Sequence, residues 1–278
     1  VASHLGLHHE TLHFRPSDLP RVLDHMGQSL SEPITDGGYP AMWILSEQIA
    51  AQGFKVALSG DGADEHFGGY PTSFAHKIAP AASAARPLLS RVTASLPAST
   101  QNLSSTYLAR RFVDGSHLPT PRRNQVWLGA FLPEEIQSLM KEPSEPWSAV
   151  DRWTETASTL PDPALQAMFL DQRLYLAEGV LQKVDRASMA HGLEVRSPFL
   201  DHLLVELASR LPTKSLWRGR STKVLVRRML ADKLPADILK RPKKGFGTPL
   251  GSWLKGPCRP LLDELDSSLE AFLHPAPI

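Results

Sequence analysis

The chain has 278 residues, of which 42% are hydrophobic and 21% charged, so it is expected to fold around a buried core. A formal net charge of +1 gives no reason to expect a nucleic-acid partner, which requires a concentrated basic surface. The single cysteine, Cys258, excludes a disulfide within the chain and, with no signal-peptide pattern, favours a cytoplasmic location. No apolar run approaches the ~20 residues of a membrane span.

The N-terminal segment, VASHLGLHHETLHF, resembles the middle of an α/β unit and has no initiator Met. We therefore expect the chain to be a fragment that was cut upstream of a natural boundary. A short strand is predicted from His8 to Phe14, with Leu12 and Phe14 on one face. The histidines of this segment favour no metal site, because alternation along a strand would place them on two faces.

Two helices and a strand follow in α/β order. Apolar residues at helical spacing predict a helix from Ser17 to Leu30, and a second helix is predicted from Pro40 to Gln52. The segment from Phe54 to Leu58 is short, apolar and followed by glycines, which is typical of a buried strand. This order predicts a parallel sheet, in which ligands bind at the carboxyl ends of the strands.

The residues after Tyr70 show no further strand pattern and are predicted to be mainly helical. Asp162 and Pro163 form a good helix start, because aspartate caps the first turn and proline suits the first helical position. The predicted helices span residues 101–114, 124–132, 133–140, 162–175, 178–190, 201–211 and 221–233. The predicted fold class is therefore α/β and predominantly helical, with a small parallel sheet.

The stretch LSGDGADEHFGGYP, residues 58–71, places glycines and carboxylates directly after the predicted strand. Backbone N–H groups in a glycine-rich turn can approach an anion closely. Asp61, Asp64 and Glu65 could hold Mg²⁺, which prefers oxygen ligands and phosphates together. The stretch therefore predicts a metal-bridged nucleotide phosphate, with a calcium-binding loop or a merely capped helix start as alternatives. It is not a Walker A loop, because the G-x-x-x-x-G-K-[ST] pattern is absent.

Two further stretches combine charge with helical or loop patterns. EGVLQKVDRASMAHGLEVRSPFLDH, residues 178–202, mixes apolar helical positions with charges such as Lys183, Glu194 and Arg196, which indicates either a paired network behind a site or a solvated helix face. LKRPKKGFGTPLGSWLKG, residues 239–256, holds two adjacent lysines among prolines and glycines. Such a lysine could close over a phosphate and stabilise charge in a transition state, whereas a solvated basic turn is the alternative.

Together these stretches resemble the synthetase domain of glutamine-dependent asparagine synthetases. LSGDGADEHFGGY is similar to the family's glycine-acidic loop, and EPITDGGYPAMWILSEQIA to the segment before it. LQKVDRASMAHGLEVRSPFLDH is similar to the central helical signature, and KVLVRRMLADKLPADILKRPKKGFGTP to the C-terminal lysine loop. The resemblance implies an ATP pyrophosphatase (adenine nucleotide alpha hydrolase-like) fold. Residues 1–72 would form an α/β nucleotide-binding part and residues 73–278 a mainly helical part.

The resemblance also implies an activity and a set of site residues. The family uses ATP and Mg²⁺ to adenylate the side-chain carboxylate of aspartate, and ammonia delivered from glutamine by an N-terminal glutaminase domain then releases AMP. The implied catalytic residues are Lys243, Asp61 and Glu65, and the implied metal ligand is Asp64. The implied ATP-binding residues are Leu58, Ser59, Gly60 and Lys244. No nucleic acid or membrane partner is implied, and a homodimer is compatible with the resemblance.

Several departures from the family pattern leave alternatives open. The first phosphate loop, S-G-G-x-D-S, and the N-terminal cysteine of the glutaminase domain do not occur in the sequence, and His66 stands where Leu or Val is usual. We therefore expect this fragment to be inactive by itself. A related amidotransferase, a β-lactam synthetase or a lasso-peptide cyclase would act on another carboxylate. A non-catalytic remnant of the fold is the remaining alternative.

Overall fold

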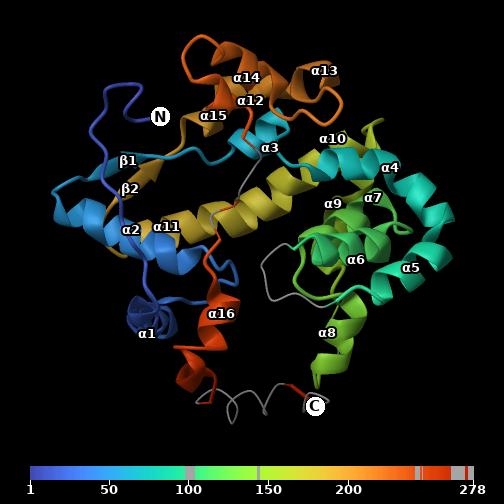
Figure 1. The fold of residues 1–278 in the computed structure, drawn as a ribbon, viewed down its shortest axis with the longest axis horizontal. Helices are drawn as coiled ribbons and strands as arrows, with labels where there is room; N and C mark the ends of the chain where they lie inside the picture. Colours follow the sequence, from blue (N-terminus) through green and yellow to red (C-terminus); the bar gives the residue numbers. More distant parts are fainter. Residues whose placement is uncertain (98–103, 143–144, 242–244, 246, 264–272, 275–278) are drawn as a thin grey trace. The chain divides into compact units, whose positions relative to one another are not determined.

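The computed structural model describes residues 1–97, 104–142, 145–241, 245, 247–263, 273 and 274. By its contacts the chain forms two compact units (Figure 1). Unit 1 consists of Val1–Pro71 and Asp171–Thr248, and unit 2 of Thr72–Leu170 and Pro249–Ile278. The sequence pattern grouped residues 171–248 with the mainly helical part. In the structure residues 171–248 belong to unit 1, because this segment supplies β2 (Glu194–Arg196), the strand that pairs with β1 (Val56–Leu58) in the sheet of unit 1.

Unit 1 contains the two strands of the described residues together with helices of varied length. Its elements are η1 (Pro16–Asp18), α1 (Leu19–Ser29), α2 (Tyr39–Ala51), β1 (Val56–Leu58), α3 (Ala63–Phe67), the π-helix η2 (Asp171–Leu181), α11 (Gln182–Met189), β2 (Glu194–Arg196), η3 (Pro198–Leu200), α12 (His202–Ser209), α13 (Thr213–Leu216), α14 (Val224–Met229) and α15 (Ala236–Leu239). Figure 1 shows α2 and α11 alongside each other near the two strands.

The sheet of the described residues consists of β1 and β2, which pair in parallel. Ala57 lies opposite Val195, and the Ser59 N–H extends the ladder by donating to the Arg196 carbonyl at 2.9 Å. The predicted parallel arrangement is therefore confirmed. The prediction that no strand follows Tyr70 is wrong, because β2 is three residues long and charged at both ends, and its pairing with β1 defines it.

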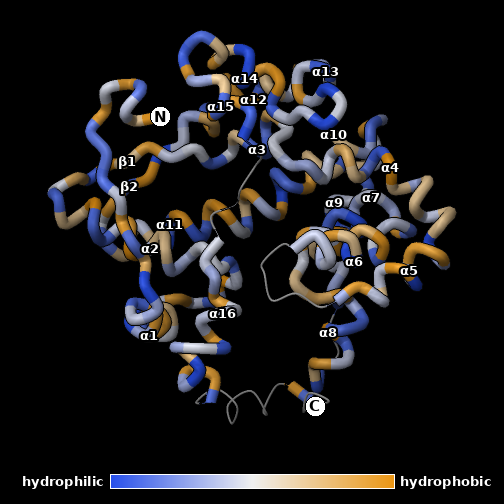
Figure 2. Tube along the Cα trace, viewed as in Figure 1, coloured by the Kyte–Doolittle hydropathy of each residue, from blue (hydrophilic) through white to orange (hydrophobic). Residues whose placement is uncertain are grey.

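Two strand predictions near the N-terminus need correction. Residues 8–14 form no strand, and a strand requires a partner that satisfies its backbone groups. The strand predicted over residues 54–58 is present as β1, but it is not buried: the exposed fraction is 43% for Val56 and 75% for Leu58. Figure 2 shows the hydrophobic residues at β1. The described residues therefore leave an apolar part of this small sheet uncovered.

The core of unit 1 lies between its helices. Tyr39 and Trp43 of α2 are buried with Val22 of α1 and Ala187 of α11. A second cluster joins η2 to α11 through apolar residues four apart, including Val180 and Val184. Burial of these faces holds α2 and α11 against each other, and α11 in turn contacts β2.

Unit 2 is helical in its described part. Its helices are α4 (Thr72–Ala84), α5 (Arg86–Ala94), α6 (Ser105–Gly115), α7 (Thr120–Leu128), α8 (Pro133–Leu139), α9 (Ser148–Ser158), α10 (Pro163–Leu170) and α16 (Leu250–Leu254). The predicted start of α10 is confirmed, because Asp162 Oδ1 accepts from the Ala164 N–H at 2.8 Å. Across the described residues, no helix is long and apolar enough to cross a membrane.

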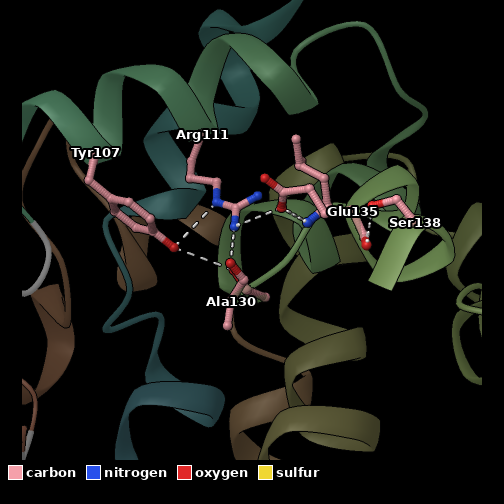
Figure 3. A network of polar contacts seen from close by, with 7 residues as sticks. Tyr107, Arg111, Ala130, Glu135 and Ser138 are labelled. Atoms are coloured by element: carbon pink, nitrogen blue, oxygen red, sulfur yellow. Dashed lines mark hydrogen bonds and ion pairs between the residues drawn. The ribbon is translucent and has the colours of Figure 1, made fainter. Parts of the chain in front are cut away.

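A buried arginine joins α6 to the segment at the start of α8 in unit 2 (Figure 3). Arg111 on α6 is only 7% exposed, and its guanidinium donates to the Tyr107 hydroxyl and to the Ala130 carbonyl. Glu135 on α8 lies 4.0 Å from the same guanidinium and accepts from the backbone N–H of Leu132. These contacts hold α8 against α6, and they involve none of the predicted site residues.

Candidate functional site

The acidic loop, which we define as residues 59–71, begins at the carboxyl end of β1. Ser197, which follows β2, donates its hydroxyl to the backbone carbonyl of Asp61. Gly62 has a φ of +83°, and a Cβ built there would lie 2.4 Å from Leu200 of η3. The loop therefore turns sharply where only glycine fits, and the segment after β2 holds it in place.

Glu65 lies on α3 in a buried polar cluster. The residue is 3% exposed, its carboxylate accepts a hydrogen bond from the Tyr70 hydroxyl at 2.5 Å, and Gln172 donates to its backbone carbonyl at 3.0 Å. Burial, and then the negative charge of Glu65, raise the pKa of Tyr70, so this hydroxyl stays protonated as a donor. Tyr175 packs edge-on against Tyr70, and burial raises the pKa of Tyr175 to about 12. Glu65 is thus held by a fixed donor.

Asp64 makes an ion pair with Lys223 that joins two distant segments. Asp64 Oδ1 lies 2.8 Å from Lys223 Nζ, and both side chains are mostly buried. Lys223 has a φ of +50°, which is uncommon for a residue with a side chain, and its N–H donates to the Gly68 carbonyl at 3.3 Å. A Cβ at Gly69 would lie 1.7 Å from Asp64 Oδ1, so the glycine provides the space for the pair.

A second ion pair links α11 to the loop before α2. Lys183 Nζ lies 2.7 Å from Asp36 Oδ2, and the lysine side chain is 12% exposed. Asp36 Oδ1 accepts from the Gly38 N–H at 2.7 Å, so both carboxylate oxygens are used. Lys183 therefore belongs to a paired network. Glu194 and Arg196, in contrast, form an exposed pair that contributes little to stability.

The predicted site residues that the structure describes lie on one short stretch but differ in how exposed they are. Leu58 and Gly60 are exposed, whereas the hydroxyl oxygen of Ser59 is buried and has no hydrogen-bond partner among the described residues. Asp61 is half-buried beside the segment after β2, and Asp64 and Glu65 follow it on the first turns of α3. The predicted Lys243 and Lys244 lie outside the described residues.

Sequence reasoning missed three partners. Lys223 pairs with Asp64, Tyr70 donates to Glu65, and Asp36 pairs with Lys183 of α11. Asp36 precedes two glycines in a quoted segment, so its turn position was a usable signal. Lys223 and Tyr70 carried no local signal of their partners. His66, the departure from the family pattern, is buried, and burial lowers its pKa, so it is held as a neutral side chain.

The acidic loop fits a metal-bound nucleotide through its carboxylates and its exposed start. The described residues contain no group of three or more His, Cys, Asp or Glu side chains placed to hold a metal ion. Mg²⁺ commonly takes only one or two protein carboxylates and completes its shell with phosphates and water, which fits the carboxylates of the acidic loop. The buried Ser59 hydroxyl and the exposed backbone at Gly60 fit a polar ligand at the end of β1.

Comparison with known proteins identifies the family. Residues 1–276 match the family described as "Asparagine synthase". "Asparagine synthetase [glutamine-hydrolyzing] 1" of Bacillus subtilis is 28% identical over 269 residues, which are 93% of this chain and 40% of that protein. A Mycobacterium tuberculosis protein is 30% identical over 239 residues, which are 81% of this chain and 34% of that protein. "Amidase chry2" of Gibberella zeae is 24% identical over 84% of this chain and 38% of its own length.

The chain therefore spans between a third and two-fifths of the length of these relatives. The match to the family covers nearly the whole chain and includes the acidic loop, α11 and the lysine-rich stretch over residues 239–256. Its fold is mostly helical with a two-stranded parallel sheet, and its acidic loop lies at the carboxyl end of a strand. On these grounds the chain belongs to the asparagine synthase family.

Proposed function

We propose that this chain supplies the synthetase part of a protein that carries out ATP-dependent amide synthesis on the side-chain carboxylate of aspartate. The carboxylate oxygen attacks the α-phosphorus of ATP and pyrophosphate leaves; glutamine-derived ammonia then attacks the activated carbonyl and AMP leaves, giving asparagine. The observation that supports this proposal most directly is the acidic loop, which begins at the carboxyl end of β1 and is held there by the segment after β2, in a chain of the asparagine synthase family.

We assign the ATP-binding role to the start of the acidic loop. The exposed Leu58 and Gly60 leave the backbone open to a ligand, and the buried Ser59 hydroxyl is available as a donor or acceptor. This arrangement extends the proposal to an ATP pyrophosphatase fold, of which β1 and β2 would form part. Lys244, outside the described residues, completes the proposed ATP-binding set.

We assign the catalytic and metal roles to the carboxylates and to Lys243. Asp64 is the proposed metal ligand, and its ion pair with Lys223 must open before its carboxylate can bind a cation. Glu65, held by Tyr70, is proposed to support the metal ligand on α3, and the half-buried Asp61 is proposed to assist formation of the adenylated intermediate. When bound, Mg²⁺ supplies neutralising charge to phosphate oxygens. Lys243 is proposed to stabilise charge that develops on the leaving phosphates.

The test is the aspartate-dependent exchange of labelled pyrophosphate into ATP, measured on the full-length protein. The exchange reports adenylation alone, because it does not require ammonia. The variant Asp64→Asn should abolish exchange, and the matched control Asp232→Asn, an exposed carboxylate in the same unit, should leave it unchanged. Equal exchange in the wild type and in Asp64→Asn would contradict the assignment of the acidic loop.

A second candidate is a related amidotransferase, β-lactam synthetase or lasso-peptide cyclase that adenylates another carboxylate. The similarity to an amidase of Gibberella zeae at 24% identity supports keeping this candidate. Exchange that is stimulated by other carboxylic acids but not by aspartate would favour it. A non-catalytic remnant of the fold, in contrast, predicts no exchange with any carboxylate and no binding of ATP. The full-length protein is proposed to carry a glutaminase domain and to lie in the cytoplasm. A homodimer is compatible with this proposal.

A further inference from the structure

A pocket of about 520 Å³ lies in unit 1 where the acidic loop ends. Its walls are the end of that loop, the turn before α14 and the residues after α15. Its polar lining consists of Arg220, Ser221, Thr222, Arg227, Lys240 and Arg241. A volume of this size is within the range of small-molecule sites.

The charge of the pocket is one-sided. Four of the lining residues are cations and none is acidic. Within the described part of the chain, Arg227, Lys240 and Arg241 take part in no ion pair. Asp64, a carboxylate of the adjoining loop, is already paired with Lys223. Several like charges that share one concave surface without a carboxylate create a strongly positive potential.

The walls of this pocket are built from fixed backbone contacts. Arg218 and Ser221 exchange two backbone hydrogen bonds of 3.0 Å, which close a tight turn with Gly219 at a φ of +61°. Arg227 donates from Nε to the Thr222 carbonyl at 2.8 Å and from Nη2 to the Arg241 carbonyl at 3.5 Å. Arg227 therefore holds two walls at once, and the cations cannot spread apart without losing these bonds.

We propose that this pocket binds a multivalent anion of the phosphate class. Guanidinium groups match phosphate oxygens in pairs, and the neighbouring hydroxyls of Ser221 and Thr222 add neutral donors. A single carboxylate would leave most of the positive charge uncompensated, whereas pyrophosphate or a phosphorylated metabolite would balance it. The proposal goes beyond amide synthesis, because it requires no adenylation and no metal.

The anion can come from two sources that share this chemistry. It can be the phosphate chain of a nucleotide held by the acidic loop, since that loop forms one wall of the pocket. It can also be a free phosphate compound that binds independently of the nucleotide. The two sources predict different competition with ATP.

The test is isothermal titration of inorganic pyrophosphate into the full-length protein without nucleotide. The double variant Lys240→Gln with Arg241→Gln removes two exposed cations whose side chains form no hydrogen bond or ion pair within the described residues. The control variant Arg228→Gln with Lys233→Gln removes the same charge from exposed positions of the same unit outside the pocket. Circular dichroism confirms that both are folded.

We expect one pyrophosphate per chain, with affinity at least tenfold weaker in the pocket variant and changed by less than about twofold in the control. Absence of binding to the wild type, or equal weakening in both variants, would overturn the proposal. A titration in the presence of saturating ATP then identifies the source. Full competition assigns the pocket to the nucleotide's phosphates, and undiminished pyrophosphate binding assigns it to a free anion.

Discussion

Replacing Gly69 by alanine should break the Asp64–Lys223 ion pair through steric conflict alone. The added Cβ would lie 1.7 Å from Asp64 Oδ1 and 2.5 Å from Lys223 Cε, whereas ordinary contacts begin at 3.4 Å. Both atoms lie at the ends of side chains that can rotate away, so the overlap is relieved mainly by breaking the ion pair. The side chains are 13% and 25% exposed, so loss of the pair adds more than a surface pair would and less than a fully buried one. We expect a net destabilisation of about 1–2 kcal/mol.

Differential scanning calorimetry measures this effect, at about 2–4 °C per kcal/mol for a unit of this size. The matched control is Gly60→Ala in the same loop, where a Cβ meets nothing within 4 Å, so it should change stability by less than about 0.5 kcal/mol. Combining Gly69→Ala with Lys223→Ala should cost less than the sum of the two single changes, because both act on one pair. Equal melting temperatures for the two alanine variants would refute the steric argument.

Three further predictions concern other parts of the molecule. Tyr70→Phe removes one hydroxyl donor to the Glu65 carboxylate and should destabilise the fold by about 1–2 kcal/mol in urea unfolding, whereas Tyr175→Phe should cost less. Burial lowers the pKa of His76 to about 4, so the unfolded chain binds more protons below pH 6.5. Stability should therefore fall by up to about 3 kcal/mol as pH drops from 6.5 to 4, and His76→Gln should flatten this profile. Lys243→Ala should slow adenylation by orders of magnitude while ATP affinity changes little in rapid-quench and binding assays.

Each of these predictions has an opposing result. Equal losses in Tyr70→Phe and Tyr175→Phe would show that the Glu65 contact contributes nothing of its own. A pH profile that stays steep in His76→Gln would assign the titration to another group. A larger loss of rate in Lys244→Ala than in Lys243→Ala would place the proposed catalytic lysine one position later.

Local patterns predicted the acidic loop and several helices, among them α1, α2 and α10, because their signals lie within a few residues. The helices α4, α5 and α9 were not predicted. The capping Asp162, the turn at Gly62 and the helix α2 after Gly38 depend on neighbours in the sequence. Boundaries moved where a different residue capped the helix: α6 starts after Ser104, whose hydroxyl accepts from the Tyr107 N–H. The acidic loop was found for the same reason, since its glycines and carboxylates are contiguous.

Contacts between distant segments could not be predicted from one sequence. β2 is defined by its pairing with β1, and Lys223 is defined by Asp64, far earlier in the chain. The π-helix Asp171–Leu181 could not be told from an α-helix by sequence, because its apolar residues fit an α-helix equally well. The sequence therefore locates the carboxylates of the site, and tertiary structure supplies the groups that hold them.

The most direct test of the central claim is the product analysis of the full-length protein with aspartate, ATP, Mg²⁺ and ammonia. The account predicts that asparagine, AMP and pyrophosphate form in equal amounts, that omission of aspartate stops pyrophosphate formation, and that Asp64→Asn stops all three products. Formation of ADP and phosphate, or asparagine formation that persists in Asp64→Asn, would contradict adenylation at the acidic loop.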